Sequence, residues 1–97
     1  MQVTYHPEAE QELRESARFY ESRLAGLCDE FLDAVNAAVH SILADPERFP
    51  VVEDDIRRCR VKRFPFCIYF RFKTDAIRIL VVKHHSRHPD YWKHRRD

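Results

Sequence analysis

The sequence of 97 residues contains one glycine, three cysteines and no long apolar run. With Gly26 as the only glycine, Ser86 lacks the flanking glycines of a nucleophile elbow, which excludes a serine hydrolase of that type. No stretch approaches the ~20 apolar residues of a membrane span, and the N-terminus carries no basic-then-apolar signal segment. We therefore expect a soluble protein of the cytoplasm with no membrane partner.

The three cysteines are odd in number and form no CxxC pair, which argues against a disulfide scaffold. Cys28, Cys59 and Cys67 all lie in apolar patterns, so we expect small core hydrophobes in a reducing compartment. No repeat, low-complexity tract or linker interrupts the chain.

The chain is too short for a doubly wound nucleotide enzyme, a barrel enzyme or a two-domain clamp, and it predicts one domain over residues 1–97. Its apolar share of 44% is enough for a core, but its net charge of +1 hides a strong polarity. Residues 1–50 carry four Lys/Arg against ten Asp/Glu, a net charge of −6. Residues 51–97 carry thirteen against six, a net charge of +7. This asymmetry predicts that the C-terminal half meets a polyanion or an acidic partner.

Apolar residues at helical spacing dominate the first half of the chain. After a short strand over residues 2–6, one stripe predicts a helix from about residue 8 to 25. Gly26 follows where a helix C-cap favours positive φ, and a second stripe over residues 28–44 ends before an Asp-Pro pair. So short a connection predicts an antiparallel helical hairpin.

From residue 56 the apolar period becomes strand-like and predicts three strands, over residues 56–63, 66–73 and 76–84. The acidic, proline-containing segment 45–55 predicts a solvated crossing, and residues 87–96 form a short tail. We therefore expect an α+β fold in which an N-terminal helical hairpin packs on a small antiparallel β-sheet.

The burial of apolar side chains selects a strand register, because a slip of one residue would mix arginines into the core layer. The expected pairs are Phe72 with Ile77, Phe70 with Ile79, Ile68 with Val81, Val61 with Ile68, and Cys59 with Phe70. The opposite face would then present Arg58, Arg60, Lys62, Cys67, Tyr69, Arg71, Arg78, Leu80, Val82 and His84.

Two interpretations of this basic face stay open. Its arginines could be solvated and paired with the loop acids Glu53, Asp54 and Asp55. Alternatively, the guanidinium groups could follow a phosphate backbone while Tyr69 stacks on a base.

The C-terminal segment is rich in histidine, arginine and aromatic residues. A zinc site is disfavoured because no cysteine lies at ligand spacing and adjacent histidines on a strand point apart, so we expect no metal and no cofactor. Metal-independent ribonuclease chemistry fits better, since histidine, tyrosine and arginine can supply a base, an acid and a cation. We expect Trp92 to anchor the tail on the edge of the core.

The order of elements and residues resembles the RelE/ParE superfamily of toxins from type II toxin–antitoxin systems over nearly the whole chain. The residues that carry the resemblance are Tyr5-His6-Pro7-Glu8-Ala9, Phe19-Tyr20, Gly26 with Phe31, Ile42 with Pro46 and Pro50, Arg63-Phe64-Pro65-Phe66, Ile79-Leu80-Val81-Val82, and His84-His85-Ser86-Arg87-His88-Pro89 with Trp92 and Arg95. The resemblance implies a compact growth-inhibiting toxin, of plasmid-stabilisation type, that a cognate antitoxin holds inactive.

The superfamily divides by target. RelE-like members cut mRNA at the ribosome with strand cations and a C-terminal arginine and tyrosine, and ParE-like members are associated with DNA gyrase. Cys67 stands where the RelE-like third-strand arginine is expected, and His85 stands near the C-terminal arginine. The longer helical hairpin and the Phe-Pro-Phe turn resemble the ParE-like branch, which is the interpretation we favour over an mRNA endonuclease.

The two branches give different roles to the candidate residues. Only the ribonuclease interpretation makes His85, Arg87 and Tyr91 catalytic. Under either interpretation, the residues expected to bind the target or a nucleic acid are Arg58, Arg60, Lys62, Arg71, Arg78 and His84.

Overall fold

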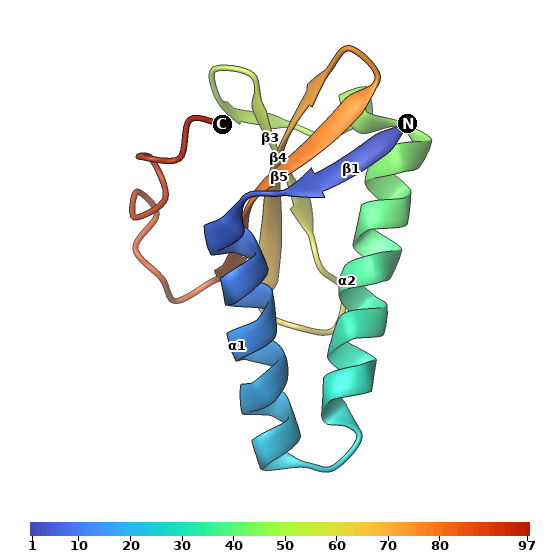
Figure 1. Ribbon diagram of the computed structural model, residues 1–97, viewed down its shortest axis with the longest axis vertical. Helices are drawn as coiled ribbons and strands as arrows, with labels where there is room; N and C mark the ends of the chain where they lie inside the picture. Colours follow the sequence, from blue (N-terminus) through green and yellow to red (C-terminus); the bar gives the residue numbers. More distant parts are fainter.

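Two long helices follow a short first strand. The computed structural model describes all 97 residues, and it begins with β1 (Gln2–Tyr5), α1 (Pro7–Arg23) and α2 (Leu27–Ala44). The predicted helical hairpin is confirmed, and its tip projects beyond the sheet (Figure 1). Neither helix is apolar over enough of its length to traverse a lipid bilayer.

The hairpin turn uses Gly26 differently from the expectation. Gly26 has the positive φ of 89° that was predicted, but it is the N-cap of α2, whereas Leu24 ends α1. The Glu21 carboxylate accepts hydrogen bonds from the backbone N–H groups of Gly26 and Cys28, at 3.2 and 3.0 Å. These bonds satisfy N–H donors at the start of α2 that have no partner within the helix.

The second half of the chain forms a short 3₁₀ turn (Pro46–Arg48) and four strands. These strands are β2 (Val51–Glu53), β3 (Ile56–Arg60), β4 (Phe66–Lys73) and β5 (Ala76–His84). The bounds predicted for β4 and β5 are confirmed to the residue, β3 is shorter than predicted, and β2 lies in the segment expected to be irregular.

The five strands form one open sheet in the order β1-β5-β4-β3-β2. The β3–β4 and β4–β5 pairs are antiparallel, as predicted, and β2 adds a further antiparallel pair with β3. β1 instead runs parallel to β5, so the sheet is mixed, and the first and last strands of the chain are neighbours although both helices and three strands lie between them in sequence. The α+β fold class is confirmed.

A β-bulge corrects the predicted register between β4 and β5. Phe72 pairs with Ile77 and Phe70 with Ile79, as expected, but a shift between Tyr69 and Phe70 then pairs Ile68 with Val82. Because an extra residue reverses the alternation of side chains, Val82 lies on the helix side of the sheet and Val81 on the opposite side.

The predicted register between β3 and β4 is wrong by two residues. Cys59 pairs with Ile68, and Arg57 pairs with Phe70. The reason is a tight turn, which the Val61 N–H closes with a 2.9 Å hydrogen bond to the Phe66 carbonyl. A shift of two residues leaves each side chain on its expected face, so Cys59 is still in the core.

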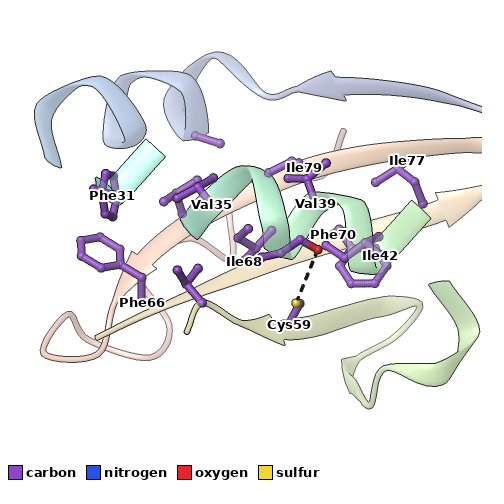
Figure 2. Packing of buried hydrophobic residues seen from close by; sticks show 14 of the residues in the cluster. Phe31, Val35, Val39, Ile42, Cys59, Phe66, Ile68, Phe70, Ile77 and Ile79 are labelled. Carbon is purple, nitrogen blue, oxygen red and sulfur yellow. Dashed lines mark hydrogen bonds between the residues drawn. The ribbon is translucent and has the colours of Figure 1, made fainter. Parts of the chain in front are cut away.

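The core lies between the helical hairpin and one face of the sheet (Figure 2). Phe31, Val35 and Ile42 of α2 are almost fully buried against sheet residues such as Phe70. Each of these side chains contributes on the order of 1.5–3 kcal/mol when it leaves water. Cys59 packs here as the expected small hydrophobe, with its Sγ 3.9 Å from the Ala38 carbonyl oxygen.

Candidate functional site on the outer face of the sheet

The outer face is the side of the sheet that faces away from the helices, and the C-terminal segment 85–97 covers part of it (Figure 1). Trp92 is only 3% exposed, and its ring meets Tyr69 edge to face at a centroid distance of 5.0 Å. Trp92 packs in a second apolar cluster with Leu80 and Val81. The expected anchoring role of Trp92 is therefore confirmed, whereas the expectation of an open basic face is wrong over the covered part.

A buried ion pair joins the C-terminal segment to α1 and β5. The Arg95 side chain is 5% exposed and donates to the Glu12 carboxylate at 2.8 and 3.0 Å and to the Leu80 carbonyl at 2.9 Å. Glu12 also accepts from the backbone N–H of Val82 at 3.0 Å and from the Tyr91 hydroxyl. Both charged groups thus have partners from separate segments of the chain, which is the form in which buried charge is tolerated.

Sequence reasoning missed the Glu12–Arg95 pair because the two residues are 83 positions apart. The only local signal is that Glu12 lies between Ala9 and Leu13, beside the apolar stripe of α1.

Tyr91 and Arg87 contact each other in the C-terminal segment. The Arg87 guanidinium carbon lies 4.0 Å from the centroid of the Tyr91 ring, and the Tyr91 hydroxyl donates to Glu12. Burial, together with the hydrogen bond to the negatively charged Glu12, raises the pKa of Tyr91 far above its usual value. The phenol therefore stays protonated at neutral pH, and its proton is engaged with Glu12.

His85 is engaged elsewhere. Its Nε2 atom lies 3.5 Å from the Sγ atom of Cys67 on β4. The three residues that the ribonuclease interpretation makes catalytic are thus divided between two contacts, His85 with Cys67 and Arg87 with Tyr91.

The other histidines of the segment also have separate partners. His88 Nδ1 accepts from the Asp90 N–H at 3.0 Å, and His94 lies 2.8 Å from a Glu8 oxygen. His84 belongs to the helix side of the sheet, where its ring meets Phe66 edge to face at 5.1 Å. No group of three or more His, Cys, Asp or Glu side chains converges as a metal site.

The position of His84 corrects the expectation that it shares a face with Arg58. The bulge that reverses Val82 also turns His84 toward α1, where it lines a groove of about 470 Å³ with Glu12 and Phe19.

We call the part of the outer face under the C-terminal segment 85–97 the tail-covered part. The acids of the 53–55 loop pair with cations of this part. The single Nε–H of Arg71 is shared by both carboxylate oxygens of Asp55, at 2.9 and 3.1 Å, and Glu53 lies 2.8 Å from Lys93. Burial alone would raise the pKa of Asp55, but the hydrogen bond and charge of Arg71 outweigh it and hold that pKa below its usual value. Arg78 donates to a terminal oxygen of Asp97 at 2.6 Å. Arg71 also donates to the Arg96 carbonyl, so Arg71 and Arg78, both expected to bind a target, hold the C-terminal segment in this structure.

The remaining cations of this face lack acidic partners. Arg60, Cys67 and Lys83 lie directly opposite one another on β3, β4 and β5, and Arg58 lies opposite Tyr69 in the next row. We call Arg58, Arg60 and Lys83 the basic cluster. None of the three has a carboxylate oxygen within 4.0 Å. Burial raises the pKa of the Cys67 thiol, and the three cations reduce that rise.

Lys83 is a functional candidate that sequence reasoning missed. Lys83 is 7% exposed, and its ammonium group donates one hydrogen bond, to the His84 carbonyl at 3.2 Å. The sequence did not predict its position because strict alternation without the bulge places Lys83 among core residues rather than beside Arg60.

A groove of about 800 Å³ lies between α2 and β3. One wall carries Glu30 and Asp33 of α2, and the other carries cations of β3 and its following turn. The groove also contains apolar surface from Ala34, Ala37, Ala38, Phe49 and Cys59. Lys62, expected to bind a target, is exposed at this groove.

The β3 strand leaves a free edge at the same groove. β2 pairs with Ile56 and Arg57, and the Arg58 N–H bonds to the Pro50 carbonyl at 3.0 Å. Beyond Arg58 no further strand lies beside this edge. The groove therefore combines apolar surface, charge of both signs and an open strand edge, which are features that suit an extended peptide.

Comparisons with known proteins agree with this architecture. Residues 3–89 match the family model described as the ParE toxin of the type II toxin–antitoxin system parDE. A solved structure described as "Chromosomal ParDE TA system from P. aeruginosa" aligns with a TM-score of 0.63 and 24% identity, covering 87% of this chain and 95% of that chain. Among curated proteins, none matches the chain. Because the family match spans most of the sequence, the chain belongs to the ParE toxin family of type II toxin–antitoxin systems.

Proposed function

We propose that the chain inhibits growth by binding DNA gyrase, without enzymatic activity of its own, and that a cognate antitoxin neutralises it. Membership of the ParE toxin family supports the toxin role. The observation that carries the choice of a binding mechanism is the engagement of the Tyr91 hydroxyl with Glu12.

A metal-independent ribonuclease needs a base, an acid and cations around one phosphodiester. Tyr91 is held by Glu12, Arg87 stacks on the Tyr91 ring, and His85 lies against Cys67. This arrangement offers no group of three that faces a common point. Cys67 also occupies the strand position at which the resemblance to RelE-like enzymes implies an arginine.

Purified gyrase, ATP and relaxed plasmid test the proposal directly. Addition of the chain should reduce supercoiling or trap cleaved DNA, and preincubation with the antitoxin should abolish the effect. Unchanged supercoiling at a molar excess of the chain would contradict a gyrase target.

The alternative is a RelE-like mRNA endonuclease that acts at the ribosome, and the basic cluster favours it because its cations have no acidic partners. Primer extension on mRNA from expressing cells separates the two. Codon-phased cuts that persist with chelator would establish the endonuclease, whereas growth arrest without cuts supports the gyrase proposal.

We propose further that the antitoxin docks through an extended, acidic segment in the groove between α2 and β3. The similar solved structure is described as a ParDE system, and in this chain the groove supplies apolar surface next to Arg48, Arg60, Lys62 and Arg63. Charge attraction is screened by salt and apolar burial is not. Affinity should therefore fall between about 0.05 and 1 M salt without vanishing. A salt-independent affinity would place the antitoxin elsewhere.

A further inference from the structure

A second groove lies on the opposite side of the helical hairpin from the groove between α2 and β3. α1 packs over β5 and α2 over β3, and β4 separates these two strands in the sheet. The second groove, of about 470 Å³, lies between α1 and the end of β5, and we call it the α1/β5 groove. The two grooves share no lining residue, so an antitoxin segment in the first groove leaves the α1/β5 groove open.

The apolar lining of the α1/β5 groove is mainly aromatic. It includes Phe19 and Tyr20 of α1 and Phe66 of β4. Tyr20 and Phe66 pack into the core, but Phe19 is 52% exposed. The Tyr20 ring meets Phe19 edge to face at 5.5 Å, and the Arg23 guanidinium carbon lies 5.0 Å from the centroid of the Phe19 ring. An exposed aromatic ring that is already held in place loses little conformational freedom when a partner covers it.

The end of β5 presents hydrogen-bond donors to this groove that no acceptor of the chain satisfies. His84 Nδ1 accepts from the Ser86 N–H at 2.9 Å, so the proton of the neutral imidazole is on Nε2, which has no partner in the structure. The Arg87 guanidinium carbon lies 4.0 Å from the centroid of the Tyr91 ring, and Arg87 has no carboxylate oxygen within 4.0 Å. An acceptor brought by a partner would complete both groups.

The acids of the groove determine where a partner's carboxylate can bind. Glu12 is already engaged with Arg95 and with the Tyr91 hydroxyl. Glu15 is exposed, lines the groove and makes no ion pair. A carboxylate would be repelled beside Glu15 on α1 and attracted beside Arg87 at the end of β5.

We propose that the chain binds its protein target through the α1/β5 groove, and that the target contributes an apolar side chain next to an Asp or Glu. The apolar side chain packs on Phe19, and the carboxylate accepts from Arg87 and from His84 Nε2. Aromatic and arginine side chains are enriched among the residues that contribute most to protein interfaces. A nucleic-acid strand is less favoured, because Glu12 and Glu15 in the lining repel a polyanion. The inference rests on the proposed function, since it takes gyrase as the target.

Binding of purified gyrase to the immobilised full chain, followed by biolayer interferometry, tests the proposal. Phe19→Ala should weaken the affinity about tenfold, because it removes the aromatic anchor. Arg87→Gln should weaken it about fivefold, because it removes a charge-assisted hydrogen bond. Glu15→Gln should strengthen it about twofold, because it removes the repulsion of the carboxylate. A supercoiling assay with the same variants should show the same order of inhibition.

Two matched controls change residues outside both grooves. Arg18→Gln removes the same charge as Arg87→Gln from an exposed residue of α1. Val51→Ala truncates an apolar side chain that is 51% exposed, on β2 at the edge of the sheet furthest from β1. Each control should change the affinity for gyrase less than about twofold. Thermal denaturation verifies that every variant is folded, and Phe19→Ala stays decisive if Arg87→Gln disturbs the packing of Tyr91.

The proposal is overturned if the unchanged chain inhibits gyrase and both Phe19→Ala and Arg87→Gln inhibit it equally well. It is also overturned if these variants weaken antitoxin binding as much as gyrase binding, which would make the antitoxin the occupant of the groove. Self-association of the chain that the same variants abolish would instead make a second copy the occupant. If the unchanged chain neither binds nor inhibits gyrase, the proposed function itself fails, and this assignment of the target surface fails with it.

Discussion

Buried cations have carboxylate partners in the tail-covered part of the outer face but not in the basic cluster. In the tail-covered part, Arg71 and Arg95 are largely buried, and each has a carboxylate at 2.9 Å or closer. In the basic cluster, Lys83 is equally buried and has none. The difference indicates that the chain can supply counter-ions where a cation serves the fold, and that Lys83 serves something else.

The tail-covered part shows what a cation does for the fold. Arg95 brings a C-terminal residue, the first helix and β5 together through the Glu12 carboxylate and the Leu80 carbonyl. With Trp92, this contact closes the outer face over the second apolar cluster. No comparable segment is attached by the basic cluster.

Breaking the Glu12–Arg95 pair should have the largest effect. Glu12→Ala leaves Arg95 with the Leu80 carbonyl and with the half-exposed Glu8 carboxylate, 2.7 Å from its Nε atom, and it removes an acceptor from Val82 and Tyr91. We therefore expect a loss of about 3 kcal/mol in the free energy of unfolding, at the lower end of the range for a broken buried ion pair. Urea denaturation measures this loss.

A control for Glu12→Ala is available on the same helix. Glu15 is exposed and makes no ion pair, so Glu15→Ala should change stability by less than about 0.5 kcal/mol. The double variant Glu12→Leu/Arg95→Met replaces the pair with apolar side chains and should recover most of the loss. Equal effects of Glu12→Ala and Glu15→Ala would mean that the pair does not hold the tail.

The sequence was sufficient where alternation or helical spacing was unambiguous. β4 places Phe66, Ile68, Phe70 and Phe72 at every second position and ends in the alternation Phe70-Arg71-Phe72-Lys73, and its bounds were predicted to the residue. The run Ile79-Leu80-Val81-Val82 is apolar throughout, so either face could accept each residue and no local pattern marks the bulge. β2 has three residues, too few for a periodic pattern, and its Val51 and Val52 are exposed.

The sequence predicted the more exposed residues of the candidate site, but it did not predict the buried ones. Arg58 and Arg60 alternate on β3, so the sequence alone places them on one face. Lys83 joins them only through the bulge, and Glu12 meets Arg95 only through the folded chain. Long-range contacts of this kind leave no mark on local periodicity.

Removing the charge of Lys83 should have an intermediate effect on stability, and the effect should be stabilising where that of Glu12→Ala is destabilising. Lys83→Met keeps a long apolar side chain and abolishes a buried charge without a counter-ion, so stability should be unchanged or rise by about 1 kcal/mol. Thermal denaturation in phosphate-free buffer checks this. A marked loss would mean that Lys83 serves the fold as Arg95 does, and the contrast between the two parts would disappear.

The smallest expected effect is on the pH dependence of stability, and it compares Asp55, which pairs with Arg71, with an acid that has no ion pair. The pKa of Asp55 is lower in the folded chain than its usual value, because Arg71 outweighs the effect of burial. A carboxyl group with a lowered folded pKa contributes stability above its unfolded pKa, about 4, and loses it as the pH falls through the folded value. Wild type should therefore lose more stability than Asp55→Asn between about pH 5 and pH 3, by under about 1 kcal/mol because Asp55 is 43% exposed. The control is Asp75→Asn, which removes an exposed acid without an ion pair and should leave the loss of unfolding free energy between these pH values as in wild type. If the unfolding free energy of Asp55→Asn instead fell with pH in parallel with wild type, the charge of Asp55 would not stabilise the fold through Arg71.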